Sequence, residues 1–333
     1  LNQFGARSGG LMRVVVVLLF WLVGLVAAAA EPCPGNPDAL GTSRVLSISP
    51  SDFTRIGSMQ YAKTLPLNDH EVVITFDDGP IPPYTNAVLD TLASQCVKAT
   101  YFLVGEMAQA YPSIVRRIYN SGHTIGTHSQ NHPFAFQRLT TAKFERQVDA
   151  GIASVDTALG DQKAVAPFFR IPGLGRTNAI EDYLASKSLV TWSADVVADD
   201  WKRIGAREIV RRAMRRLKAR GRGILLLHDI HPATVTALPM LLKELKDRGY
   251  HVVQVVADVE RPESVPEPVA SPDAKEPWPR ALQASTTQGT PDKVATRHRV
   301  KKAISRKRRR PAMATLREPN YGATAKDWWH KQF

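Results

Sequence analysis

The sequence predicts an α/β fold in which parallel strands are joined by crossover helices. Two observations between residues 71 and 256 indicate this fold. Short runs of apolar and β-branched residues are typical of buried strands, and stretches with helical amphipathic spacing separate them. Seven strands with six helices between them suit a barrel better than an open sheet, although the pattern alone leaves the open sheet as an alternative.

The predicted strands are short and rich in Val, Ile, Leu, Phe and Thr, the residues that favour extended structure. They are expected at 72–76, 99–104, 124–127, 167–171, 189–193, 223–227 and 251–256. The predicted helices repeat apolar residues at intervals of three and four. They are expected at 86–95, 107–121, 141–159, 178–188, 206–220 and 234–248.

The helix expected at 206–220 contains a dense set of basic residues. Its apolar residues fall on a single helical face, which leaves the basic ones on the opposite side. These apolar residues are Val210, Ala213, Met214 and Leu217. We therefore interpret it as a solvated outer helix and not as a nucleic-acid-binding one.

The two ends of the 333-residue chain differ from the middle. Residues 1–30 carry two arginines and no acid, then an apolar run and four alanines, the order of a secretory signal cleaved after Ala30. An uncleaved membrane anchor is the alternative. Residues 31–70 have few signals and are expected to wrap the domain at 71–260. Residues 261–333 are Pro-rich and then basic, with 16 Lys and Arg against 7 Asp and Glu, and are expected to be disordered.

The charge and the cysteines bear on location and partners. The formal net charge is +13, and a dense basic run occupies residues 297–310. In an exported protein such a run would meet anionic envelope polymers or lipids, so nucleic acid is not the expected partner. The sequence contains two cysteines, Cys33 and Cys96, and in an exported protein we expect them to form a disulfide.

Asp77 and Asp78 follow the first predicted strand and precede Gly79-Pro80. Adjacent carboxylates repel each other, so each requires a separate partner. The division we expect is one carboxylate on a metal ion and one free to transfer protons. Asp-Asp-Gly-Pro is also good turn chemistry, so the remaining parts of a metal site must decide.

His128 and His132 follow the third predicted strand. Histidines four residues apart lie on the same side of a helical turn and can reach one ion. Together with one aspartate they supply three ligands, the number found in catalytic zinc sites that keep one position open for water.

Three further polar groups end predicted strands. Arg170 ends the fourth strand inside an apolar stretch and needs an anion, which the free carboxylate of the aspartate pair could supply. Asp195 follows the fifth strand, and His228 follows the sixth. Active sites of α/β folds assemble at the carboxyl ends of their strands, so this gathering of polar groups predicts one there.

Five segments resemble, in order, the motifs of the polysaccharide deacetylase family, carbohydrate esterase family 4. They are TFDDGP, HSQNH, FFRIPG, the Asp…Asp-Trp segment and LLLHD, and the resemblance covers about residues 70–258. It implies a distorted (β/α)7 barrel and hydrolysis of N-acetyl or O-acetyl groups on polysaccharides such as peptidoglycan or chitin-like oligomers. It also implies a divalent metal, with Zn²⁺ expected and Co²⁺, Mn²⁺ or Ni²⁺ as alternatives.

The resemblance also implies a role for each matching residue. The metal ligands would be Asp78, His128 and His132. The catalytic set would be Asp77 as general base, Arg170 as its positioning partner, His228 as general acid and Asp195 as the charge partner of His228. The pocket for the acetyl group and its oxyanion would be formed by Gly173, Trp201 and Leu227.

Two departures from the family pattern have consequences. Gly173 stands where the family usually has an aromatic residue, so one sugar-stacking contact is missing. The spacing of the fourth motif leaves the choice among Asp195, Asp199 and Asp200 as partner of His228 open. Two other functions compete with deacetylation: an envelope-binding protein without catalysis, and an iron(II) oxygenase that uses two histidines and a carboxylate.

Overall fold

The computed structural model describes residues 33–160 and 165–258 of the chain. The signal sequence expected at residues 1–30 and the tail expected at 261–333, with its basic run at 297–310, lie outside the described residues. Within the described residues, no helix combines the length and the apolar character needed to cross a bilayer.

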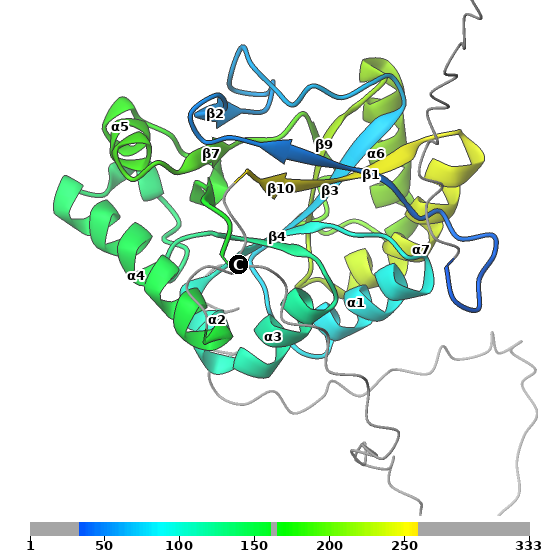
Figure 1. Cartoon of the computed structure of the whole chain (residues 1–333), viewed down its shortest axis with the longest axis horizontal. Coiled ribbons are helices and arrows are strands. Elements are labelled where there is room, and N and C mark those ends of the chain that lie inside the picture. Colours follow the sequence, from blue (N-terminus) through cyan, green and yellow to red (C-terminus); the bar gives the residue numbers. More distant parts are fainter. Residues whose placement is uncertain (1–32, 161–164, 259–333) are drawn as a thin grey trace, which may run out of the picture.

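The seven strands expected from the sequence occur in the expected order, and β1, β2 and β8 are additional (Figure 1). The strands are β1 (Thr42–Ile48), β2 (Arg55–Ile56), β3 (Glu71–Asp77), β4 (Thr100–Leu103), β5 (Thr124–Thr127), β6 (Phe168–Arg170), β7 (Val190–Trp192), β8 (Val196–Val197), β9 (Gly223–His228) and β10 (His251–Ala257).

Helices fill the intervals between most of the strands. They are α1 (Tyr84–Ser94), α2 (Gly105–Ala110), α3 (Pro112–Asn120), α4 (Thr141–Leu159), α5 (Asn178–Ser186), α6 (Ala206–Arg220) and α7 (Pro232–Asp247). Two 3₁₀ turns, η1 (Phe136–Arg138) and η3 (Pro172–Leu174), follow β5 and β6. The single helix expected at 107–121 is divided, because Pro112 begins a new helix after Tyr111.

All the strand pairs are parallel, which confirms the predicted α/β class. β3 pairs with β9 along most of its length, with β10 at its first two residues and with β4 at its last three. From β4 the order continues through β5 and β6 to β7. β8 then pairs with β9, so the chain from β7 into β8 completes a circle of strands consistent with the distorted barrel.

Strand alternation divides the apolar side chains between two cores. On β3, Val72, Ile74 and Phe76 face the surrounding helices, whereas Val73 faces the interior. Phe102, Phe168 and Trp192 fill the interior with Val73, and aromatic contacts link them, with centroids 5.4 Å apart for Phe102–Trp192 and 5.0 Å apart for Phe168–Trp192. The interior is therefore a packed core below the site, as in other parallel barrels.

The N-terminal segment contributes strands to the sheet and does more than wrap the domain. β1 pairs in parallel with β10, a strand about two hundred residues later, and the blue and gold arrows run side by side in Figure 1. β2 pairs with β7. Neither strand was predicted. β1 alternates between partly buried and exposed residues and has one buried residue, so it lacks the continuous apolar run of a buried strand.

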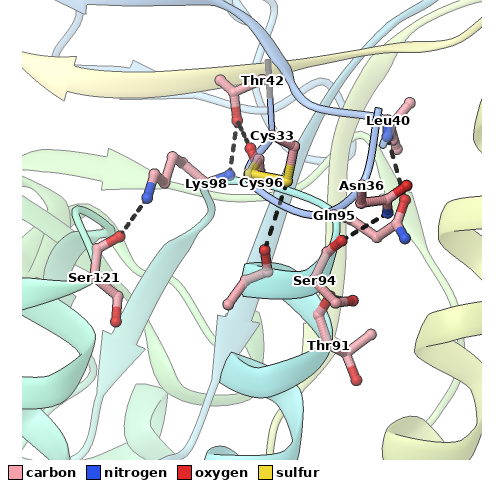
Figure 2. Close-up of a disulfide and its surroundings, with 11 residues drawn as sticks. Cys33, Asn36, Leu40, Thr42, Thr91, Ser94, Gln95, Cys96, Lys98 and Ser121 are labelled. Carbon is pink, nitrogen blue, oxygen red and sulfur yellow. Dashed lines mark hydrogen bonds between the residues drawn. A yellow bond between two sulfur atoms is a disulfide. The ribbon is translucent and has the colours of Figure 1, made fainter. Parts of the chain in front are cut away.

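The expected disulfide between Cys33 and Cys96 is confirmed and ties this segment to the end of α1 (Figure 2). Thr42 reinforces the attachment: its hydroxyl donates to the Cys96 carbonyl at 3.3 Å and accepts from the Lys98 N–H at 2.7 Å. The start of the described chain is therefore anchored covalently and by hydrogen bonds.

Candidate active site

The polar residues at the carboxyl ends of the strands surround one pocket of about 450 Å³. β3, β5, β6, β8 and β9 end at it or continue into the loops that line it. Among its lining residues are Asp77, Asp78, His128, His132 and His228. The structure therefore brings these five side chains together at one edge of the sheet.

Asp77 is the last residue of β3 and is held by a buried arginine. Arg170, on β6, is fully buried, and its Nη1 donates to Asp77 Oδ1 at 2.6 Å and to Thr75 Oγ1 at 2.8 Å. Its Nη2 donates to the Ser193 carbonyl at 3.0 Å, and its guanidinium stacks on Phe102 at 4.2 Å from the ring centroid. Arg170 therefore fixes one oxygen of Asp77 and leaves Oδ2 directed elsewhere.

Asp78 begins the turn after β3 in a conformation that few non-glycine residues adopt, with φ of 79°. The next residue must be glycine, because a Cβ at Gly79 would lie 2.3 Å from the carboxylate of Asp229. Asp229 is fully buried and accepts a hydrogen bond from Thr85 Oγ1 at 2.7 Å. Burial raises the pKa of Asp229 to about 7. The turn that presents Asp78 is therefore packed directly on the segment that follows β9.

His128 and His132 lie in the loop after β5. This loop is a bend and not the helical turn expected, and Ser129 and His132 have φ of 68° and 50°. His128 Nδ1 lies 2.6 Å from the Arg170 carbonyl, which can only accept, so Nδ1 carries the proton. The Nε2 lone pair of His128 is therefore available on the side of Asp78, an arrangement common for histidines that bind metals.

Asp78, His128 and His132 fit a divalent metal ion. Their ligand atoms lie within 4.8 Å of one another, and the two Nε2 atoms are 3.4 Å and 3.5 Å from Asp78 Oδ1. Ligands about 2.0–2.2 Å from a tetrahedral ion lie roughly 3.3–3.6 Å apart, which agrees with these distances. Asp78 Oδ1 is buried and has no hydrogen-bond donor.

The electrostatics of Asp78 also suit a metal ligand. Burial alone would raise the pKa of Asp78, but the nearby charges of His132 and His228 hold it well below its usual range. The carboxylate is therefore ionised at neutral pH.

His228 ends β9 directly beside Asp77. The two residues are paired in the register of β3 and β9, so both side chains face the same pocket. Asp200 Oδ1 lies 2.9 Å from His228 Nδ1, and Asp200 Oδ2 accepts from the His228 N–H and from Thr234 Oγ1, each at 2.7 Å. Burial alone would lower the pKa of His228, but Asp200, Asp78 and Asp77 raise it to about 10.

Of the three candidates Asp195, Asp199 and Asp200, the one that pairs with His228 is therefore Asp200, which corrects the assignment of Asp195 that the resemblance implied. Asp195 accepts from Ser58 and Thr64, and its Oδ2 accepts from the N–H of Ile224 at 2.8 Å. Ile224 lies four residues before His228, about 13 Å along the strand. The physical reason is that the chain continues as β8 after Asp195, so the strand edge lies at Asp199 and Asp200.

The pocket wall requires a second correction. Leu227 is fully buried in the outer core between strands and helices, whereas Leu226 lines the pocket. Alternation along β9 explains this, because the side chains of Leu226 and His228 lie on one face of the strand and that of Leu227 lies on the other. Gly173 and Trp201 line the pocket as expected.

Asp199 is a pocket residue whose role the sequence did not indicate. It is buried and binds Arg212 Nη1 at 2.7 Å and Arg216 Nη2 at 2.9 Å, both on α6. Burial would raise the pKa of Asp199, but these two arginines lower it to about 2. Thus part of the basic face of α6 anchors the loop before Trp201, and the remainder faces solvent as predicted.

Comparisons with known proteins identify the family of this chain. The sequence model of the polysaccharide deacetylase family matches residues 65–192. A peptidoglycan-N-acetylglucosamine deacetylase of Bacillus cereus is 34% identical over 196 residues, which is 57% of this chain and 89% of that protein. The peptidoglycan-N-acetylglucosamine deacetylase PgdA of Listeria monocytogenes is 32% identical over 184 residues, or 55% of this chain. The match spans only 38% of the Listeria protein.

A solved structure has the same fold. The peptidoglycan deacetylase Bd3279 of Bdellovibrio bacteriovorus superposes with a TM-score of 0.58 at 29% identity, covering 66% of this chain and 63% of that one.

Proposed function

This chain belongs to the polysaccharide deacetylase family, and we propose that it is a metal-dependent hydrolase that removes acetyl groups from an N-acetylated envelope polysaccharide. One observation supports the proposal above the others. The adjacent carboxylates Asp77 and Asp78 have different partners: Asp77 is bound by Arg170, and Asp78 faces His128 and His132. This is the division of labour that amide hydrolysis requires, with one carboxylate for proton transfer and one for the metal.

Asp78, His128 and His132 would hold the ion, and Zn²⁺ suits a site with two imidazoles and one carboxylate. When bound, a divalent ion would polarise the acetyl carbonyl and lower the pKa of a water molecule beside it. Co²⁺, Mn²⁺ and Ni²⁺ are the alternatives that metal analysis of the purified protein would distinguish.

The residues of the chain would perform the proton transfers. Arg170 occupies Asp77 Oδ1, so Oδ2 would accept the proton of the attacking water. Asp200 fixes His228 Nδ1, so Nε2 would donate its proton to the leaving nitrogen. The raised pKa of His228 keeps it protonated at neutral pH, as a general acid requires. The Gly173 N–H would stabilise the developing oxyanion, and Leu226 and Trp201 would contact the acetyl methyl.

The substrate we propose is peptidoglycan, because the relatives described above are named as peptidoglycan deacetylases. Acetate release should be measured on purified peptidoglycan, on N-acetylglucosamine oligomers and on acetylated xylan, which carries O-acetyl groups. The polymer that gives the highest kcat/KM identifies the substrate class.

The central experiment compares the wild-type protein with Asp77→Asn and Asp78→Ala. Asp77→Asn should lower kcat by about 10²- to 10⁴-fold and retain the metal, since it removes only a general base. Asp78→Ala should lose the metal, as a chelator should remove it from the wild type. Full activity in Asp77→Asn would refute the mechanism, and a metal-loaded wild type that releases no acetate from any polymer would refute deacetylation.

We also propose that the protein is exported and acts in the envelope, as a periplasmic or secreted enzyme. The Cys33–Cys96 disulfide supports this, because structural disulfides persist in oxidising compartments. The basic run at 297–310 would add weak contact with anionic polymer or lipid, which salt screens. Deleting residues 290–333 should lower envelope retention at low salt; unchanged retention would contradict that contact.

A further inference from the structure

Large exposed apolar side chains gather at the mouth of the candidate active site. Among the described residues five such side chains are exposed, namely Val45, Met59, Tyr119, Phe134 and Trp201. Three of them, Met59, Phe134 and Trp201, line the same pocket as the metal and proton-transfer residues. Phe134 is the most exposed, at 87%. Apolar groups left in water around one pocket indicate a binding surface.

The strand order places two of these side chains on either side of the loop that contains Gly173. Phe134 follows β5, Gly173 follows β6, and Met59 follows β2, which pairs with β7. A Cβ built on Gly173 meets no atom within 4 Å. The glycine therefore leaves open space in the pocket that Phe134 and Met59 also line, at the position where the family usually has an aromatic side chain.

The loop that carries Phe134 is anchored on both sides. Before it, the Asn131 N–H donates to Gln147 Oε1 at 3.1 Å. After it, Phe136 is fully buried and packs on Phe169, with ring centroids 6.4 Å apart. The aromatic side chain of Phe134 is therefore presented to solvent from a backbone that is held in place.

The side chains that line the pocket indicate which kind of ligand binds there. None of the residues that line this pocket, all within the described part of the chain, is Lys or Arg. The pocket lining therefore offers no Lys or Arg to an anionic group, and its exposed side chains suit a ligand with an apolar face. The pocket floor is lined by carboxylates and imidazoles, so the same ligand must also carry polar groups. A pyranose ring has both, since its C–H face can stack on an aromatic ring and its hydroxyls remain hydrated.

We propose that Phe134, with Met59, forms a platform for the sugar ring next to the one that is deacetylated, across the opening at Gly173. The platform replaces the stacking contact that the sequence lacks at Gly173. It would make the enzyme prefer polymer chains over single sugars. The inference rests on the proposed deacetylase function and specifies the part of the substrate that the site recognises beyond the acetyl group.

The kinetic test uses N-acetylglucosamine oligomers of one to six sugars. In the wild type, kcat/KM should rise with chain length. Phe134→Ala should reduce kcat/KM through KM by about 3- to 10-fold on the longer oligomers, the value of one aromatic contact, and leave the single sugar unchanged. Phe134→Trp should restore the wild-type value, and Met59→Ala should give a smaller loss.

Tyr119→Ala is the matched control, because Tyr119 is an exposed aromatic residue that does not line the pocket. It should behave as the wild type at every chain length. The metal content of Phe134→Ala must also be measured, because Phe134 is two residues from His132 and a disturbed metal loop would lower it. It should equal that of the wild type. An equal loss on all oligomers, or no loss on any, would overturn the platform.

A binding measurement separates this inference from the proposed reaction. In the Asp77→Asn background, isothermal titration with the N-acetylglucosamine hexamer should give a Kd that Phe134→Ala raises by about 3- to 10-fold. This result is expected even if the wild type were to release no acetate, which would refute only the reaction. An unchanged Kd would refute the platform and leave the reaction untouched.

Discussion

Replacing Asp200 with asparagine tests the assignment of the histidine partner directly. Asp200→Asn preserves the size of the side chain and removes its negative charge. Asp200 Oδ1 lies 2.9 Å from His228 Nδ1, the carboxylate is fully buried and the imidazole is 12% exposed, so little water screens the attraction. Asp195→Asn is the comparison, because the sequence pointed to that residue and the structure places it beside Ile224.

The expected change in the pKa of His228 follows from the charged groups around it. Neighbouring carboxylates raise the pKa of His228 from 6.5 to about 10 despite its burial, a difference of roughly 5 kcal/mol in favour of the imidazolium. Asp200 contributes most to this increase. Its neutralisation should lower the pKa of His228 by at least about 2, or roughly 3 kcal/mol.

The assay is the pH dependence of kcat/KM for acetate release, whose alkaline limb reports the general acid of the free enzyme. A bound cation beside Asp78 repels the imidazolium, so the wild-type limb should lie below pH 10. In Asp200→Asn the alkaline limb should move to lower pH by about 2 pH units. In Asp195→Asn it should stay within about 0.5 pH units of the wild-type limb. An equal shift in both variants, or a shift in Asp195→Asn alone, would refute the assignment.

Stability gives a second check with a definite sign. A raised pKa in the folded protein stabilises it below the unfolded value of 6.5, and the stabilisation is lost as the pH rises toward about 10. The unfolding free energy of Asp200→Asn should therefore differ more from that of the wild type at about pH 6 than at about pH 10.

Three further predictions concern the framework of the site. Arg170→Met should destabilise the protein by about 3–5 kcal/mol in urea unfolding, since it leaves a buried carboxylate without its cation. Gly79→Ala should weaken metal binding and lower the Tm, because the added methyl would meet a buried carboxylate, whereas Gly205→Ala, with open space around it, should change neither. Replacing Cys33 and Cys96 by serine should lower the free energy of unfolding by about 4 kcal/mol, since the disulfide closes a loop of 63 residues. An unchanged denaturation midpoint would contradict this prediction.

Local sequence patterns predicted the parts of this molecule that depend on local structure. The helices at 141–159 and 206–220 have the expected bounds, because their apolar faces are continuous and unbroken by proline. The five side chains at the strand ends come together because parallel strands place their carboxyl ends at one edge. These features need only the period of the pattern and the order of the elements.

The errors come from features that no local pattern encodes. β1 is held by a partner about two hundred residues away, so its own residues need not be strongly apolar. Asp195 was placed at the strand edge because the interruption between β7 and β8 resembles a strand end. Leu227 is different, since counting back by two from His228 would have selected Leu226. That signal was present in the sequence and was missed.

The pairing of Asp77 with His228 on neighbouring strands has a consequence for how the enzyme could diversify. The separation of the candidate base and acid is set by the hydrogen-bond ladder between β3 and β9, and no loop contributes to it. Phe134, Gly173 and Met59 lie instead on separate loops and segments that no ladder constrains. Substitutions there could redirect the protein to another polymer while the distance between proton acceptor and donor stays constant. We therefore expect that mutations can change the substrate range of this scaffold without changing the geometry of proton transfer.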